Sequence, residues 1–114
     1  MLLTVYGIPN CDTVKKARLW LADKGHDFAF HDFRKDGLSA AMVTRWLADV
    51  PMEKLLNKRG TSWRNLSDAD KANEDAAHLI ALMVENPTLI KRPVMEARQQ
   101  VTVGFTDEVK AVWS

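Results

Sequence analysis

Three consecutive segments restrict what the start of this chain can form. Leu2–Tyr6 (LLTVY) is apolar and β-branched and runs into a Gly-Ile-Pro-Asn turn, which is typical of a buried strand. Asp12–Lys24 carries apolar residues at the spacing of one helix face, and Gly25 follows as a stop signal. Asp27–Phe33 then alternates like a second strand. Strand, helix and strand within about thirty residues predict a right-handed crossover between parallel strands.

The only cysteine of the chain, Cys11, lies where the turn meets the predicted helix. At a helix N-terminus the backbone N–H groups lack intrahelical partners and the helix dipole is positive, so a negative charge is favoured. This position is expected to lower the pKa of the thiol and to make the sulfur nucleophilic. The alternative is an inert cysteine that acts as a small buried hydrophobe.

Length and composition describe an ordinary globular chain. Its 114 residues, 46% of them hydrophobic, predict one domain over residues 1–114. A net charge of +1 argues against a nucleic-acid-binding domain, and no apolar run has transmembrane length. The first residues lack the pattern of a signal peptide, and one cysteine cannot form an internal disulfide. We therefore expect a reducing compartment, the cytoplasm. We also expect the chain to be a monomer.

The middle of the chain is predicted to be helical. Ser39 is an expected N-cap for a helix over residues 40–50, and Ser67 for one over residues 68–73. Asp75–Val84 is the clearest helix of the second half and ends before Pro87. The expected inner residues of these helices are Ala40, Val43, Trp46 and Leu47 in the first and Ala77, Ile80, Ala81 and Val84 in the last.

Lys58–Leu66 (KRGTSWRNL) is predicted to be a loop that carries three cations. These cations, Lys58, Arg59 and Arg64, form an anion-binding patch or simply keep the loop solvated. Arg59 is the best candidate ligand among them, and Trp63 is a possible neighbour for a bound molecule.

The last third of the chain is predicted to be a β-hairpin and a helix. Strands at Val94–Glu96 and Val101–Val103 flank a turn at Ala97–Gln100, and Thr106 caps a helix over Asp107–Val112. The order β, α, β, helical segment, β, β, α predicts an α/β fold. Its four-stranded mixed sheet has a parallel first pair and an antiparallel last pair.

Four segments together resemble the arsenate reductase (ArsC) family, which also contains the Spx regulators and the YffB proteins. They are YGIPNCDTVKKARLWL, LLNKRGTSWRNL, NPTLIKRPV and VGF, and they span nearly the whole chain. The likeness is greatest to the YffB group. The resemblance implies a thioredoxin-like fold with a helical insertion between the βαβ unit and the C-terminal ββα unit.

The resemblance also implies roles for particular residues. Cys11 is expected to be the catalytic thiol, Arg92 an anion-binding residue, and Pro93 a cis-proline that faces the thiol. Arg92 would otherwise be a solvated arginine at the end of a strand. Asn10 and Lys15, which flank the thiol along the chain, complete the expected substrate or glutathione contacts together with Arg59.

The chain departs from the family pattern at two places. Val14 stands where some members carry a second cysteine. Arsenate reductases that depend on glutaredoxin use three arginines around the oxyanion, and only Arg92 is matched here. Asn57 stands at another of these positions, with Arg59 two residues later, and the third falls near Phe105.

These features favour a thiol reductase that uses glutathione. Because Cys11 has no partner cysteine, an external thiol from glutathione or a glutaredoxin must resolve the mixed disulfide that it forms with a small-molecule or protein disulfide. The alternatives are an arsenate reductase coupled to glutathione and glutaredoxin, and an Spx-like regulator that binds a protein such as RNA polymerase. No tightly bound cofactor or metal is expected, since His26, His31 and His78 are scattered.

Overall fold

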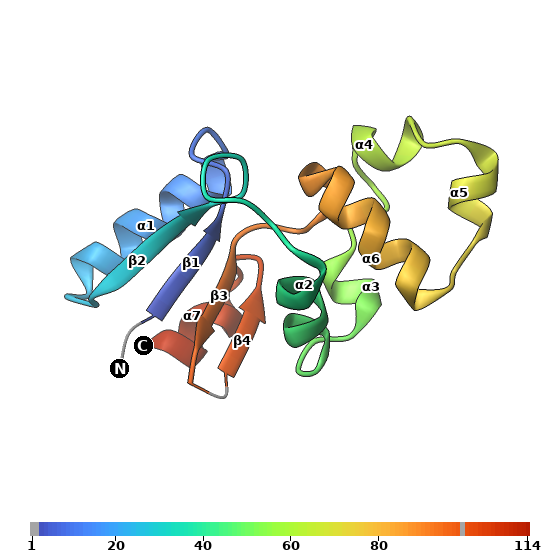
Figure 1. Cartoon of the computed structure of the whole chain (residues 1–114). Helices are drawn as coiled ribbons and strands as arrows, with labels where there is room; N and C mark the ends of the chain where they lie inside the picture. The colour runs from blue at the N-terminus through green and yellow to red at the C-terminus, as the bar shows by residue number, and fades with distance from the viewer. Residues whose placement is uncertain (1–2, 99) are drawn as a thin grey trace. The chain divides into compact units, whose positions relative to one another are not determined.

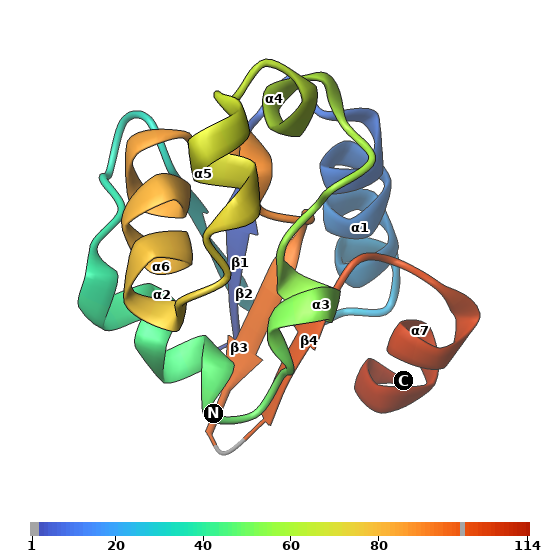
Figure 2. The ribbon, with the colours of Figure 1, turned by 90° about the vertical axis from the view of Figure 1, so that its right-hand side faces the viewer.

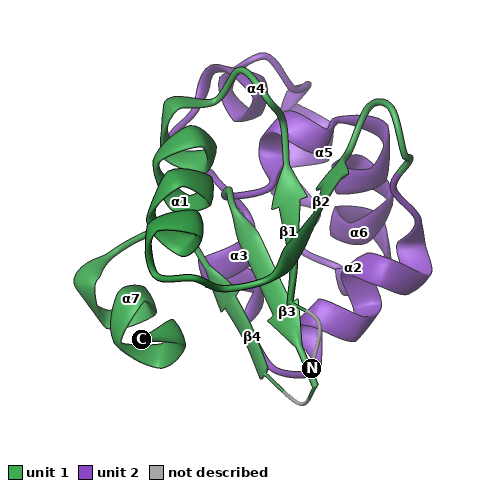
Figure 3. Cartoon of the chain, turned by 90° about the vertical axis from the view of Figure 1, so that its left-hand side faces the viewer, with its two compact units in different colours: residues 1–37, 92–114 green, residues 38–91 purple. Residues whose placement is uncertain are grey.

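The computed structural model describes residues 3–98 and 100–114. Leu2, the predicted start of the first strand, and residue 99, in the predicted hairpin turn, lie outside this range. The elements follow in the predicted order: β1 (Leu3–Gly7), α1 (Asp12–Asp23), β2 (Phe28–Asp32), α2 (Ala40–Leu47), α3 (Met52–Leu55), α4 (Thr61–Arg64), α5 (Asp68–Ala72), α6 (Ala76–Glu85), the 3-10 turn η1 (Pro87–Leu89), β3 (Val94–Ala97), β4 (Gln100–Val103) and α7 (Asp107–Trp113) (Figure 1). They belong to two compact units, residues 1–37 with 92–114 and residues 38–91 (Figure 3).

The four strands of the first unit form one mixed sheet in the order β2-β1-β3-β4. β1 and β2 are parallel, with Leu3 opposite Phe28 and Gly7 opposite Asp32. The helix α1 connects them, as parallel neighbours require. β3 runs antiparallel to both β1 and β4. The predicted four-stranded mixed sheet is confirmed.

One face of this sheet is covered by α1 and α7 (Figure 3). Alternate residues of β1 point to the same side of a sheet, so Leu3 and Val5 both face these helices. The buried residues that form this cluster are Leu3, Val5, Leu21, Met95, Ala97, Val109 and Trp113. The indole N–H of Trp113 donates to the Thr102 hydroxyl oxygen at 2.8 Å, which satisfies a polar atom inside the core. Thr106 caps α7 as predicted, since its side chain accepts a hydrogen bond from the Val109 N–H at 3.3 Å.

The second unit contains α2 to α6 and η1, with α2 packed beside α6 (Figure 2). The predicted caps are confirmed, because Ser39 and Ser67 accept hydrogen bonds from the N–H groups of Met42 and Asp70. Residues 55–57 pair with residues 89–91 through two backbone hydrogen bonds of 2.7 and 2.8 Å, which hold α3 to the end of η1. Among the described residues, no helix is long and apolar enough to span a bilayer.

The predicted inner side of the Asp75–Val84 helix is wrong. The observed helix α6 buries Leu79, Leu82 and Met83, whereas Ala77 and Ala81 are exposed. This helix is apolar around most of its circumference, so apolar spacing alone does not select a face. Turning the larger Leu and Met side chains inward removes more apolar area from water than turning the alanines inward.

Two other expectations for the second unit also need correction. The segment Lys58–Leu66 is not wholly a loop, because α4 forms one helical turn within it. In α2, the predicted inner residue Ala40 is exposed, whereas the predicted inner residues Val43 and Trp46 are fully buried. Ala40 follows the capping residue directly, and the first residue of a helix is often solvent-facing where the chain enters it.

Candidate active site

A tight turn at the end of β1 positions Cys11. The strand ends at Gly7, Ile8 is buried, and Asn10 is exposed in the turn that follows. The Cys11 N–H donates to the Ile8 carbonyl oxygen at 3.2 Å, and the Cys11 carbonyl accepts from the Lys15 N–H at 3.0 Å. Cys11 is therefore the N-cap residue of α1, with an extended backbone (φ −86°, ψ 124°), as the sequence pattern predicts.

Close packing between β1 and α1 supports this turn. A Cβ atom added to Gly7 would lie 2.8 Å from a methyl carbon of Val14, which is shorter than van der Waals contact. Val14 is fully buried. Only glycine at position 7 allows the first turn of α1 to lie so close to the strand end.

The surroundings of the Cys11 thiol favour its ionised form. Partial burial is the largest single influence and by itself would raise the pKa of the thiol. It is outweighed by hydrogen bonds from the Val14 N–H and the Arg92 side chain, the Arg92 charge, and the Thr13 N–H, so the pKa of Cys11 lies below its ordinary value.

Arg92 comes to the thiol through strand pairing. β3 is antiparallel to β1 with Val94 opposite Tyr6, so the residues just before β3 lie at the end of β1 where the Cys11 turn begins. The Arg92–Pro93 peptide bond is cis, which confirms that prediction. The Pro93 carbonyl oxygen accepts a hydrogen bond from the Gly104 N–H at 2.9 Å, which ties this segment to the end of β4.

The three remaining predicted contacts, Asn10, Lys15 and Arg59, have no established effect on the thiol. Asn10 precedes Cys11 in the exposed turn, and Lys15 is exposed one helical turn later. The groups that lower the pKa of Cys11 are the Val14, Thr13 and Arg92 groups, and Lys15 is not one of them. Arg59 belongs to the second unit, where it lines a pocket. The roles expected for Asn10, Lys15 and Arg59 therefore remain predictions.

Two groups that act on the thiol, the backbone N–H groups of Thr13 and Val14, could not be identified from the amino-acid types at these positions. Any residue except proline supplies an N–H, so the signal lies in their place on the first turn of α1 rather than in their side chains.

This arrangement provides one activated thiol without a nearby partner. The chain contains a single cysteine, and the position three residues later is filled by the buried Val14. In the part of the chain that the structure describes, no three His, Cys, Asp or Glu side chains cluster where they could hold a metal ion. The chemistry available at Cys11 is therefore nucleophilic attack by sulfur, followed by resolution from outside the chain.

Comparisons with known proteins identify the family and the fold of this chain. The ArsC family model matches residues 6–112. A solved YffB protein is 40% identical, with a TM-score of 0.91 and 96% of each chain covered. An arsenate reductase (ArsC) related protein from Brucella melitensis is 46% identical, with a TM-score of 0.78, covering 99% of this chain and 94% of that one. The global transcriptional regulator Spx of Streptococcus pyogenes is 28% identical over 99% of this chain and 86% of its own length. The chain, with its thioredoxin-like fold and its cysteine at the start of α1, belongs to the ArsC family.

Proposed function

We propose that this protein is a cytoplasmic thiol reductase that uses Cys11 as its nucleophile and glutathione as the external thiol. The observation that carries the proposal is the position of the single cysteine as the N-cap residue of α1, where Arg92 and the N–H groups of the first turn lower the pKa of its thiol. A lower pKa increases the fraction of thiolate near neutral pH, and the thiolate is the form that attacks disulfides.

The reaction balances as two thiol–disulfide exchanges. The Cys11 thiolate attacks the glutathione sulfur of a glutathionyl mixed disulfide, its S–S bond breaks, and the substrate sulfur leaves as a thiolate that takes up a proton. The thiolate of a second glutathione then attacks the glutathione sulfur bound to Cys11. This step releases oxidised glutathione and regenerates the Cys11 thiolate. Across the two exchanges, the substrate sulfur gains one electron and the sulfur of the incoming glutathione loses one, while the glutathione sulfur of the mixed disulfide stays at the disulfide level.

Charge around the thiol supports glutathione as the co-substrate. Glutathione carries two carboxylates, and a guanidinium such as that of Arg92 binds a carboxylate with two parallel hydrogen bonds. Lys15 and Asn10, exposed on either side of Cys11, are proposed as further contacts. A glutaredoxin is the proposed alternative source of the resolving thiol.

The test is turnover of a glutathionylated peptide by reduced glutathione, followed through coupled reduction of the oxidised glutathione. The variant Cys11→Ser is expected to lose all enzyme-dependent turnover, whereas Lys16→Gln, on the exposed face of the same helix, is expected to keep it. Full turnover by Cys11→Ser would exclude Cys11 as the nucleophile. Release of the free peptide thiol with dithiothreitol but not with glutathione, measured by mass spectrometry, would refute the choice of co-substrate.

Arsenate reduction is the second candidate, because a cation beside a nucleophilic thiol also suits an oxyanion. Of the two other arginines that such arsenate reductases use, one aligns with Asn57, with Arg59 two residues later, and the other falls near Phe105, where this chain has no arginine. We therefore expect slow arsenate reduction or none in the presence of glutathione and glutaredoxin. Arsenate turnover faster than disulfide turnover would reverse the order of the two candidates.

A further inference from the structure

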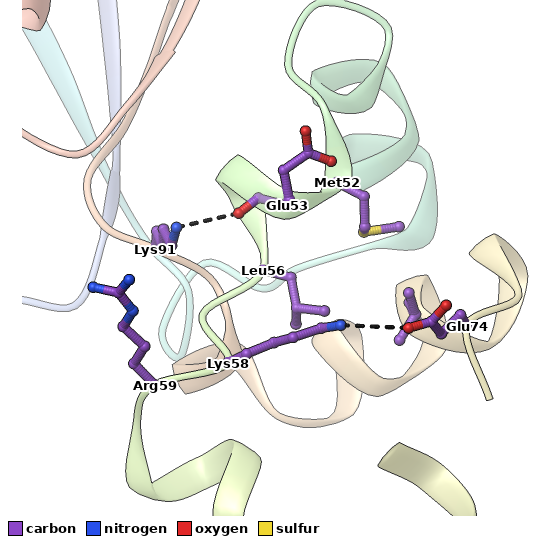
Figure 4. Close-up of a pocket in the computed structure, with 8 residues that line it drawn as sticks. Met52, Glu53, Leu56, Lys58, Arg59, Glu74 and Lys91 are labelled. Atoms are coloured by element: carbon purple, nitrogen blue, oxygen red, sulfur yellow. Dashed lines mark hydrogen bonds and ion pairs between the residues drawn. The ribbon is translucent and has the colours of Figure 1, made fainter. Parts of the chain in front are cut away.

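A pocket of about 620 Å³ opens within the second unit, and Arg59 is the one expected glutathione contact among the residues that line it (Figure 4). Three of its lining residues are apolar, namely Met52, Leu56 and Leu79. Leu56 and Leu79 are only 2% and 4% exposed, so they form a firm apolar wall. A volume of this size lies within the range of about 300–1,000 Å³ that is usual for small-molecule sites.

One of the three cations that line the pocket is already neutralised. The Lys58 ammonium lies 3.8 Å from a carboxylate oxygen of Glu74, and both residues line the pocket (Figure 4). The same ammonium lies 5.1 Å from the centre of the Trp63 ring, which also stabilises it. This pair therefore contributes little net charge to the pocket.

The other two cations, Lys91 and Arg59, have no carboxylate partner among residues 3–98 and 100–114. The Lys91 ammonium donates to the backbone oxygen of Glu53 at 3.2 Å, while the Glu53 carboxylate points away from Lys91 (Figure 4). A carbonyl oxygen is neutral, so the positive charge of Lys91 remains uncompensated.

The backbone that carries Arg59 is held from two sides. Its N–H donates to the Asn57 side-chain oxygen at 3.1 Å, and its carbonyl accepts from the Arg64 guanidinium at 2.8 Å. The backbone is thus fixed where the Arg59 side chain begins, and among residues 3–98 and 100–114 no carboxylate pairs with its guanidinium.

We propose that this pocket binds a small organic monocarboxylate with an apolar tail. The carboxylate pairs with Arg59 and Lys91, and the tail packs on Met52, Leu56 and Leu79. With Lys58 paired to Glu74, the remaining charged side chains that line the pocket are Lys91, Arg59 and Glu53, so the lining carries a net positive charge. That charge favours an anion over a cation, while the apolar wall favours a ligand whose remaining atoms are hydrocarbon. The pocket lies wholly within residues 38–91, so the proposal holds whether or not Cys11 reduces disulfides.

The test is a titration of the full-length, nitrogen-15-labelled protein with hexanoate, followed by backbone amide chemical shifts. Hexanol and hexylamine serve as probes of the same tail with neutral and positive head groups. Saturable shifts centred on residues 56–60 and 91 are expected with hexanoate. Hexanol is expected to bind about three- to ten-fold more weakly than hexanoate, because it cannot form the partly exposed ion pairs that the carboxylate forms. Hexylamine is expected to cause no saturable shift.

The matched variants are Arg59→Gln and Lys54→Gln. Arg59 and Lys54 are both exposed cations, but Lys54 lies on α3 without lining the pocket. Arg59→Gln is expected to weaken hexanoate binding about three- to ten-fold, and Lys54→Gln to leave it unchanged. The proposal is overturned if hexanoate causes no saturable shift in the pocket, if hexanol binds as tightly, or if the two variants behave alike.

Discussion

Replacing Arg92 by glutamine tests the candidate active site most directly. Its guanidinium lowers the pKa of the Cys11 thiol through a hydrogen bond and through its charge, alongside the N–H groups of Val14 and Thr13. Glutamine keeps a polar side chain at this position but removes the charge. Burial of the thiol opposes ionisation in this chain, and the substitution leaves the residues of the Cys11 turn in place. We therefore expect Arg92→Gln to raise the pKa of Cys11.

The size of the effect follows from the kind of interaction that is lost. A hydrogen bond to a charged group contributes about 1.5–3 kcal/mol, and solvent screening at a partly exposed thiol reduces this to about 1 kcal/mol. A change of that size alters the ratio of thiolate to thiol about five-fold. A more basic thiolate is also more nucleophilic, which offsets about half of the loss on a logarithmic scale. Below the pKa of both proteins the variant should therefore react about two- to three-fold more slowly, and above it about two-fold faster.

The assay is the rate of alkylation by iodoacetamide over a series of pH values, read by mass spectrometry. Because Cys11 is the only cysteine, each protein gives one thioether product. Lys15→Gln is the matched control, since it removes an exposed cation one helical turn from the thiol, whereas the lowered pKa of Cys11 is due to the Val14, Thr13 and Arg92 groups. The reasoning is refuted if Arg92→Gln leaves the pH profile unchanged, or if Lys15→Gln moves it as far.

Two further predictions concern the framework that holds the site. Gly7→Ala should lower the free energy of unfolding by about 1–3 kcal/mol in urea denaturation, because its new methyl group overlaps a Val14 methyl group; a variant as stable as the parent would contradict the close approach. Trp113→Phe should lower the free energy of unfolding by about 1–3 kcal/mol, because it leaves the buried Thr102 hydroxyl without its hydrogen-bond partner. Adding Thr102→Val removes that hydroxyl and should restore part of the lost stability. Strictly additive effects in this double-mutant cycle would mean that the hydrogen bond contributes nothing.

Local signals in the sequence predicted the elements of this protein well. Ser39, Ser67 and Thr106 each cap the helix that was expected to follow. Each side chain bonds an N–H only three residues away, so the interaction depends on neighbours in the sequence and can be read from them. The same holds for Cys11, whose place at the start of α1 follows from a strand, a turn and an amphipathic segment in succession.

Predictions that depended on packing between distant segments were less secure. α6 turns Leu79, Leu82 and Met83 inward because it packs against α2 and η1, and its own nearly uniform apolarity did not select that side. The turn α4 within Lys58–Leu66 carried no periodic signal, because four residues are too few to show one.

At Cys11, some features follow from the sequence alone and others depend on the tertiary structure. The sequence alone determined that this chain has one thiol, that it lies at a helix start, and that Val14 rather than a second cysteine follows it. The tertiary structure decided that Arg92 reaches this thiol, because the antiparallel register of β3 on β1 sets Val94 opposite Tyr6. Helix position is a property of neighbouring residues, whereas a contact between residues far apart along the chain exists only once the sheet has paired them.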